Sequence, residues 1–111
     1  MVDEIWPMFR ALGDPTRFKI FNFLRARSFD VAVEDTGEVR RVEGPTVVEV
    51  CCHVTGIERA SSAISFHLKE LRNAGLITMD KRGKYLICRV NRDAMATIET
   101  WVQDVADGAC A

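Results

Sequence analysis

The hydrophobic pattern changes from helical in residues 61–76 to strand-like in residues 76–91, and this change limits the architectures open to the chain. At about 100° per residue, Ile64, Leu68 and Leu71 fall on one stripe, which predicts an amphipathic helix. The next segment then gives a strand, a basic K-R-G-K turn and a second strand. A helix followed at once by a basic β-hairpin is therefore predicted for this half of the chain.

A second helix is predicted just before this pair. Thr46 and Glu49 form a capping-box pattern at the start of an apolar helical segment, and Ser61 or Ser62 caps the following helix. Two short helices joined by a turn form a helix-turn-helix over residues 46–75, and the hairpin that follows the second helix makes it a winged helix-turn-helix. The second helix of such a pair enters the major groove of DNA.

Two helices are predicted at the start of the chain. The first covers residues 5–12 and is interrupted early by Pro7. The second covers residues 15–27, because Asp14 is a good N-cap and Pro15 suits the first helical position. The apolar residues of the second helix are expected to form a broad buried face of Phe18, Ile20, Phe21, Phe23 and Leu24.

A β-hairpin is predicted over residues 29–43, with Gly37 in its turn, as an insert before the helix-turn-helix. The wing over residues 76–91 is followed by a last amphipathic helix over residues 92–105. We therefore expect residues 1–111 to form a single domain of the α+β class, mainly helical, with a winged helix-turn-helix and a β-hairpin insert.

The charge of the chain is unevenly distributed. The net charge is −1, yet residues 57–92 contain eight basic and three acidic side chains, which gives this segment +5. A segregated positive region attracts phosphate backbones, so we expect double-stranded DNA as a partner. The side chains expected at DNA lie on the outward ridge of the second helix and in the wing: Ser61, Ser62, Ser65, Phe66, Lys69, Lys81, Arg82 and Lys84.

Phe66 is unusual because it lies in the middle of a polar ridge. In the major groove its ring could meet the C5-methyl group of thymine. Alternatively, the ring packs onto residues 55–60 or onto a neighbouring subunit.

Several classes of function are disfavoured by what the sequence lacks. It has no apolar run of the roughly 20 residues that a membrane span needs, and its start does not resemble a signal peptide, so we expect a cytoplasmic protein without a membrane partner. It has no glycine-rich phosphate loop and no H-E-x-x-H motif. His53 and His67 are the only histidines, so few groups are available for acid–base chemistry and we do not expect an enzyme.

Four stretches of the chain resemble the ArsR/SmtB family of bacterial winged-helix repressors. They are FRALGDPTRFKIFNFL, TVVEVCCHVTG, SFHLKELRNAGLI and KRGKYLICRVN. The resemblance implies a homodimer built on the first and last helices, bound to an operator and released by thiophilic or transition metals. Aromatic and apolar residues in those helices are the expected interface: Trp6, Phe9, Ile98 and Trp101.

The metal sites that the resemblance implies are not matched here. Founding members use two cysteines, one residue apart, at the start of the third helix, and these positions correspond to Thr46 and Val48. Another family site uses Asp and His on the last helix, which lacks histidine here. A soft metal or metalloid could still bind if cysteines from different segments or subunits meet, and the candidates are Cys51, Cys52 and Cys110.

The individual cysteines and histidines have plainer expectations. Cys51 and Cys88 should be buried, whereas Cys52 should lie on the outward side of its helix and could react. His67 is expected to be structural, and His53 to form a solvated pair with Glu49.

We therefore expect a homodimeric DNA-binding repressor that is released by a thiophilic metal, a metalloid or a thiol-reactive inducer. Two alternatives remain open from the sequence. One is a winged helix that serves as a protein-interaction module, and the other is a thiol redox sensor with the same DNA output.

Overall fold

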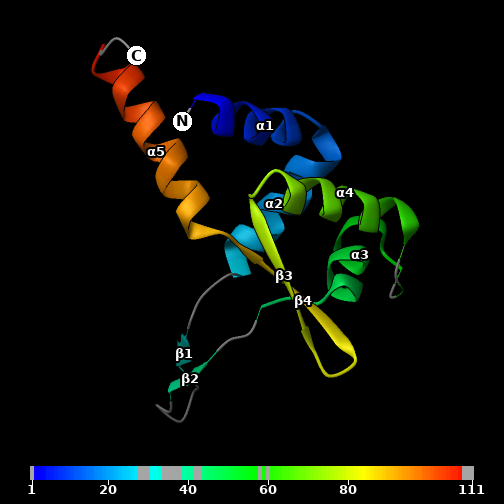
Figure 1. The fold of residues 1–111 in the computed structure, drawn as a ribbon. Coiled ribbons are helices and arrows are strands. Elements are labelled where there is room, and N and C mark those ends of the chain that lie inside the picture. Colours follow the sequence, from blue (N-terminus) through cyan, green and yellow to red (C-terminus); the bar gives the residue numbers. More distant parts are fainter. Residues whose placement is uncertain are drawn as a thin grey trace.

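The computed structural model describes residues 2–27, 31–33, 39–41, 44–57, 59 and 61–108. Its elements, in chain order (Figure 1), are α1 (Val2–Leu12), α2 (Pro15–Arg27), β1 (Val31–Val33), β2 (Val39–Arg41), α3 (Val47–Thr55), α4 (Ser62–Asn73), β3 (Ile77–Arg82), β4 (Tyr85–Val90) and α5 (Arg92–Ala106). The fold is a mainly helical winged helix-turn-helix with a hairpin insert, which confirms the predicted fold class. In the part of the chain described, no helix is both long and apolar enough to cross a membrane.

Helix α1 differs from its prediction, whereas α2 matches it. The helix continues through Pro7 instead of being interrupted there. Pro7 is the central residue of α1, and its missing N–H removes a single bond, to the carbonyl four residues back. Helix α2 begins at Pro15, and Asp14 caps it by accepting the backbone N–H of Arg17 on Oδ2 at 3.0 Å.

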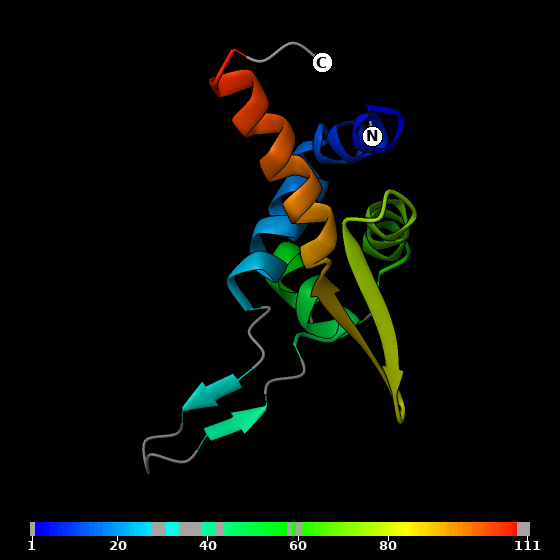
Figure 2. The same ribbon diagram turned by 60° about the vertical axis from the view of Figure 1, so that its left-hand side comes forward.

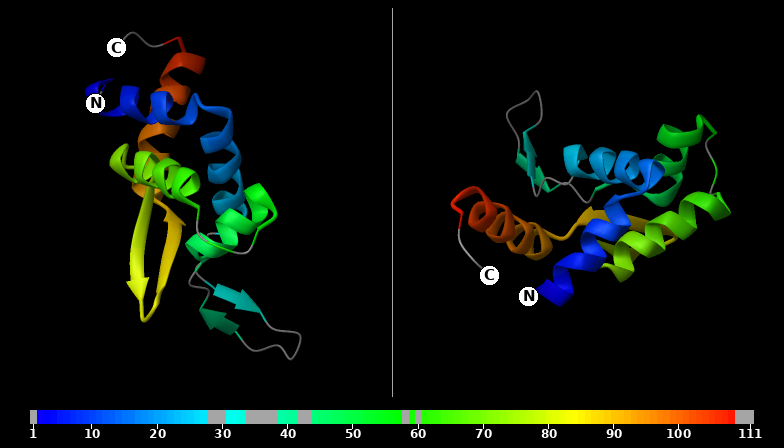
Figure 3. Two further views of the ribbon diagram at one scale, coloured as in Figure 1. Left: turned by 90° about the vertical axis from the view of Figure 1, so that its right-hand side faces the viewer. Right: turned by 90° about the horizontal axis from the view of Figure 1, so that it is seen from above.

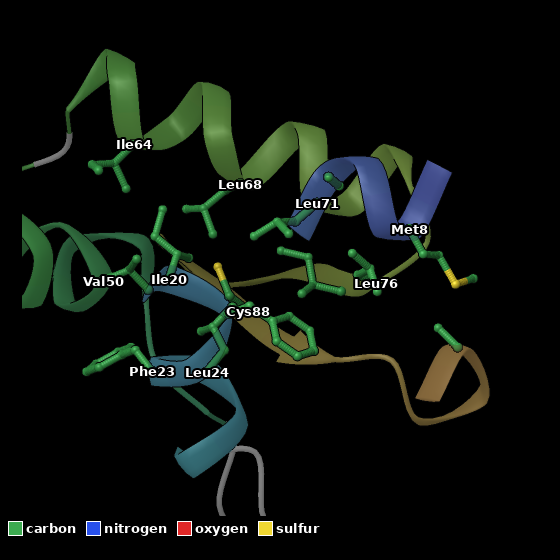
Figure 4. Packing of buried hydrophobic residues seen from close by; sticks show 14 of the residues in the cluster. Met8, Ile20, Phe23, Leu24, Val50, Ile64, Leu68, Leu71, Leu76 and Cys88 are labelled. Atoms are coloured by element: carbon green, nitrogen blue, oxygen red, sulfur yellow. The ribbon is translucent and has the colours of Figure 1, made fainter. Parts of the chain in front are cut away.

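The hydrophobic core is centred on α2 (Figure 4). Ile20 and Leu24 have no exposed surface. The buried stripe of α4, made by Ile64, Leu68 and Leu71, points towards them, as the sequence predicts. The remaining fully buried side chains come from α3 and from the segment that carries the wing: Val50, Cys51, Leu76, Ile77 and Cys88.

Phe18 lies outside this core, contrary to its prediction. Its side chain is 51% exposed, whereas Ile20, Phe21 and Phe23 are buried as expected. At about 100° per residue, Phe18 lies about 160° around the helix from Ile20 and therefore faces the opposite side. The face of α2 is broad, but it does not extend around the whole helix.

The wing has a shorter turn than predicted. Strands β3 and β4 pair antiparallel from Ile77 opposite Val90 to Arg82 opposite Tyr85, so Lys81 and Arg82 belong to a strand. The turn consists of two residues, and the first, Gly83, has a φ of 61°. Glycine at the first position of a two-residue turn matches the right-handed twist of the paired strands.

The two predicted strands of the hairpin insert are confirmed as β1 and β2, which pair antiparallel. Val31 pairs with Arg41, Ala32 with Arg40 and Val33 with Val39. The predicted turn at 35–37 lies outside the described residues. In the turned views the two short strands project away from the helices, in a direction different from that of the wing (Figures 2 and 3).

The chain is attached to the wing where it leaves the insert. The Pro45 carbonyl accepts the backbone N–H of Cys88 at 2.8 Å, and Thr46 forms a β-bridge with Ile87. Gly44 has a φ of 100°, and a Cβ atom there would lie 3.1 Å from the Cys88 carbonyl oxygen. The start of α3 is therefore fixed by β4.

Asn91 connects α5 to the end of α4. Its Oδ1 accepts the backbone N–H of Asp93 at 3.1 Å, which caps α5. Its Nδ2 donates to the Gly75 carbonyl at 2.9 Å, and its backbone N–H donates to the Leu76 carbonyl at 2.9 Å. Beyond the buried Ala94, α5 extends away from the core beside α1 (Figures 1 and 2).

We predict that Gly44→Ala destabilises the fold more than Gly56→Ala. Both residues have positive φ, at 100° and 79°, so each substitution should cost roughly 1–2 kcal/mol for the backbone conformation alone. Only at Gly44 would the new methyl group approach the carbonyl of Cys88, because nothing lies within 4 Å of the corresponding position at Gly56. Urea unfolding measures the difference, and equal losses for the two variants would contradict this anchoring role.

Candidate nucleic-acid interface

The helix-turn-helix is formed by α3 and α4 and is set by local capping. Thr46 caps α3, since its Oγ1 accepts the Glu49 backbone N–H at 3.2 Å. Gly56 caps the C-terminal end of α3: its φ is 79°, and its backbone N–H donates to the Cys52 carbonyl. Ser61 caps α4 by accepting the Ile64 backbone N–H at 3.5 Å. The predicted start of each helix is therefore correct.

The outward side of α4 holds the predicted polar ridge. Its residues line a shallow hollow of about 340 Å³, formed by Ser61, Ser62, Ser65, Phe66 and Lys69. The sequence predicts these same five residues, from α4 and its N-cap, at DNA, and the structure brings them together. The buried stripe of α4 faces the other way, into the core.

Phe66 is 56% exposed within this hollow. Its ring approaches the ring of His67, with centroids 5.9 Å apart and an edge-on angle of 60°. More than half of the Phe66 side chain is thus open to solvent in a single chain, rather than buried as the packing alternative requires. The aromatic surface stays available between hydroxyl groups and an ammonium group.

The wing supplies the basic side chains of this region. Lys81, Arg82 and Lys84 are all exposed near the tip of the hairpin. Tyr85 is 52% exposed there, and the Lys84 Nζ lies 5.3 Å from the centre of its ring. Sequence reasoning did not select Tyr85, although an aromatic residue directly after the basic turn was a visible signal. In Figure 1 the wing tip and the start of α4 both lie away from α5.

His67 has a structural partner that the sequence does not reveal. The Arg17 guanidinium approaches its Nδ1 at 3.2 Å and also donates through Nε to the Ala11 carbonyl at 2.7 Å. The Arg17 backbone N–H bonds the Asp14 carboxyl and holds its pKa below the usual value. Arginine only donates, so Nδ1 accepts in this contact. Through this contact, His67 joins α4 to the junction of α1 and α2. Helix α4 lies close to this junction when the molecule is seen from above (Figure 3).

The cysteines differ strongly in access. Cys51 and Cys88 have no exposed surface, as expected. Burial and the nearby Cys51 thiol raise the pKa of the Cys88 thiol to about 12, so almost none of it is thiolate at neutral pH. Cys52 is partly exposed and is the accessible thiol among the described cysteines, and Cys110 lies outside the described residues.

Cys52 lies in a shallow groove between α2 and α3, lined by Phe23, Arg27, Val48, Glu49, Cys52 and His53. The His53 ring packs on Phe23, with centroids 4.2 Å apart, and the Arg27 guanidinium lies 4.0 Å from the centre of the same ring. The predicted pairing of His53 with Glu49 is thus replaced by an aromatic contact, because α2 presents Phe23 beside it.

The family's metal-binding positions do not fit a metal in this chain. Thr46 uses its hydroxyl group to cap α3, and Val48 has an exposed apolar side chain. Within the described residues, no three His, Cys, Asp or Glu side chains are grouped so that they could hold a metal ion. Cys51 faces the core whereas Cys52 lines a groove, so the two adjacent cysteines do not converge.

An exposed apolar face lies at the other end of the domain, on α1 and α5. The rings of Phe9 and Trp101 meet edge-on with centroids 5.1 Å apart, and Ile98 is partly buried against the core. The exposed members of this face are Trp6 at 65%, Trp101 at 41%, Val102 at 49% and Val105 at 58%. Of the predicted interface residues, Phe9 and Trp101 are in contact and Trp6 is exposed on α1, whereas Ile98 contributes mainly to the core.

These features define a winged helix-turn-helix domain, and solved structures share its fold. An ArsR family transcriptional regulator is 21% identical, with a TM-score of 0.65 over 94% of this chain and 93% of its own. A possible transcriptional regulator for arsenical resistance is 24% identical, with a TM-score of 0.60 over 89% and 83%. A homodimeric winged helix-turn-helix DNA-binding domain from Mycobacterium bovis, a possible ArsR-family regulator, is 19% identical, with a TM-score of 0.60 over 96% and 81%. No family model and no curated protein sequence matches the chain.

Proposed function

We propose that this chain is an ArsR-type transcriptional regulator that binds operator DNA as a homodimer and acts as a repressor. The observation that carries this proposal is the hollow on α4, in which three serines, Phe66 and Lys69 face outward together. Hydroxyl and ammonium groups on one helical face suit base edges and phosphates in a major groove. The basic wing and the structural similarity to ArsR-family regulators support the same conclusion.

The exposed face on α1 and α5 supports the dimer. Large apolar side chains that stay exposed on a small domain mark an interaction surface. The face carries two tryptophans, Trp6 and Trp101, and tryptophan is enriched among the residues that dominate binding energy. The similar M. bovis domain is described as homodimeric. A two-fold dimer would present two α4 helices to successive turns of DNA.

We further propose that any inducer response runs through thiols. The partly exposed Cys52 is the most accessible described thiol, and the family's metal positions lack ligands. The groove around Cys52 adjoins α3, the first helix of the helix-turn-helix, so modification there would act next to the DNA-binding unit.

We predict salt-sensitive binding to duplex DNA. Each phosphate contact should lower log K by about 0.9 for each unit of log salt. Replacing Lys81, Arg82 and Lys84 by Ala should weaken binding to all sequences about equally and reduce the salt slope by about 1 for each cation that no longer meets a phosphate. Fluorescence anisotropy over a salt series measures both quantities. Arg25→Ala removes one positive charge at the exposed far end of α2; it is the control for each single wing substitution and should change neither quantity.

Binding that does not change between low and physiological salt would contradict the DNA interface. It would instead favour a protein-interaction module built on the same fold.

We predict that Trp6→Ala weakens the dimer. Trp6 is 65% exposed, so the free energy of unfolding of the monomer should change little. A buried interface tryptophan contributes about 2 kcal/mol or more, and two-fold symmetry removes it twice, so dimer dissociation should rise by at least several hundred-fold. Sedimentation equilibrium measures this constant. Phe18→Ala, which removes a 51% exposed ring from α2, should leave it unchanged, and equal effects would contradict the interface.

We predict that Cys52 is alkylated before Cys51 and Cys88 in the native protein. Its thiol is partly exposed, whereas Cys51 and Cys88 are buried and the Cys88 pKa is raised to about 12. Iodoacetamide labelling followed by peptide mass mapping gives the order, and the three should react at similar rates once the chain is unfolded in denaturant. If a thiol reagent releases DNA, Cys52→Ser should prevent the release and Cys88→Ser should not. A zinc response that survives replacement of all four cysteines would contradict the thiol route.

A further inference from the structure

Phe66 occupies a position that the general proposal of DNA binding does not explain. Its ring is 56% exposed, at the centre of a hollow whose other members are polar. Ser62 lies one turn before it, Ser65 lies beside it and Lys69 lies nearly one turn after it on the same face of α4. A ring at the centre of a polar face suits an occupant that is apolar at one point and polar around it.

The exposed apolar residues of α5 and the exposed ring of Phe66 differ in the partner that they suit. Trp101, Val102 and Val105 on α5 are themselves apolar and exposed, which suits the broad apolar core of a protein interface. Phe66, by contrast, is surrounded by hydroxyl groups and one ammonium group. Among the base edges in the major groove of B-DNA, the C5-methyl of thymine is the apolar group, and it lies next to polar base edges and charged phosphates.

We infer that Phe66 determines sequence specificity by packing its ring on the C5-methyl group of a thymine in each half-site. This inference rests on the proposed DNA binding and adds the identity of the base that is read. Cytosine lacks the methyl group, and guanine and adenine present polar atoms in the major groove, so the ring favours thymine at that position. The polar neighbours of Phe66 then meet adjacent base edges and the backbone.

Uracil isolates the methyl group, because it differs from thymine only at C5 and keeps the same base-pairing edge. The probe is the most enriched duplex selected by the wild-type protein from random duplexes about two helical turns long. Each thymine is replaced by deoxyuridine in turn, symmetrically in the two half-sites. At one position the affinity should fall about four-fold for each methyl group removed, which corresponds to about 0.8 kcal/mol, and therefore about fifteen-fold for the pair.

Two variants connect this effect to the ring. Phe66→Ala should bind the thymine duplex more weakly and should no longer distinguish thymine from uracil at the sensitive position. Phe18→Ala is the matched control, because Phe18 is 51% exposed but lies on α2, outside the hollow. It should keep the wild-type affinity and the full methyl effect. Thermal unfolding of both variants checks that the fold is retained.

The outcomes separate this inference from the function on which it rests. Wild-type protein that binds duplex DNA with salt dependence, but shows no loss at any uracil position, overturns the role of Phe66 and leaves DNA binding intact. A full methyl effect in Phe66→Ala also overturns it. If the wild-type protein does not bind duplex DNA at all, both the role of Phe66 and the proposed DNA binding are overturned. If Phe66→Ala does not fold, the uracil series on the wild-type protein still decides whether a methyl group is read.

Discussion

Packing onto α2 positions each part of the candidate interface. Ile20 and Leu24 are fully buried, and α1, α3, α4 and β4 all contact this helix. Arg17 adds a polar connection at the start of α2, since its guanidinium group bonds the Ala11 carbonyl and approaches Nδ1 of His67. The orientation of α4 is thus set by the apolar packing of its buried stripe and by the contact between His67 and Arg17.

Features that depend on neighbours in the sequence were predictable, whereas features that depend on distant contacts were not. Helix capping by Thr46 is local, and the helical period alone separated the buried stripe of α4 from its polar ridge. The contact between Arg17 and His67 joins residues that are 50 positions apart, and no periodic pattern reports it. The extent of β3 was also missed, because strand pairing, rather than the basic composition of the turn, decides where the strand ends. Phe18 shows that an apolar residue within a helix need not lie on its buried face.

The candidate site shows the same division. Residues of one helix could be assigned to a common hollow from spacing alone, and the structure groups them. The sequence could not decide whether Phe66 was packed or exposed, because that depends on what else approaches α4. The different environments of Cys51 and Cys52 followed from their directions on α3, but the aromatic contact of His53 with Phe23 required the placement of α2. Surface chemistry is thus predictable along one helix and becomes uncertain where two elements meet.

The attachment of Pro45 and Thr46 to β4 makes the preceding insert modular. The chain rejoins the body of the domain through a backbone hydrogen bond and a β-bridge, so the position of α3 does not depend on the length of the segment before it. The entropy of closing a loop grows only slowly with its length, and lengthening this one should add little cost. Homologous chains could therefore gain or lose a hairpin here without changing the spacing between the recognition helix and the wing. A reporter segment could be grafted at the same junction without changing the geometry of α4 and the wing.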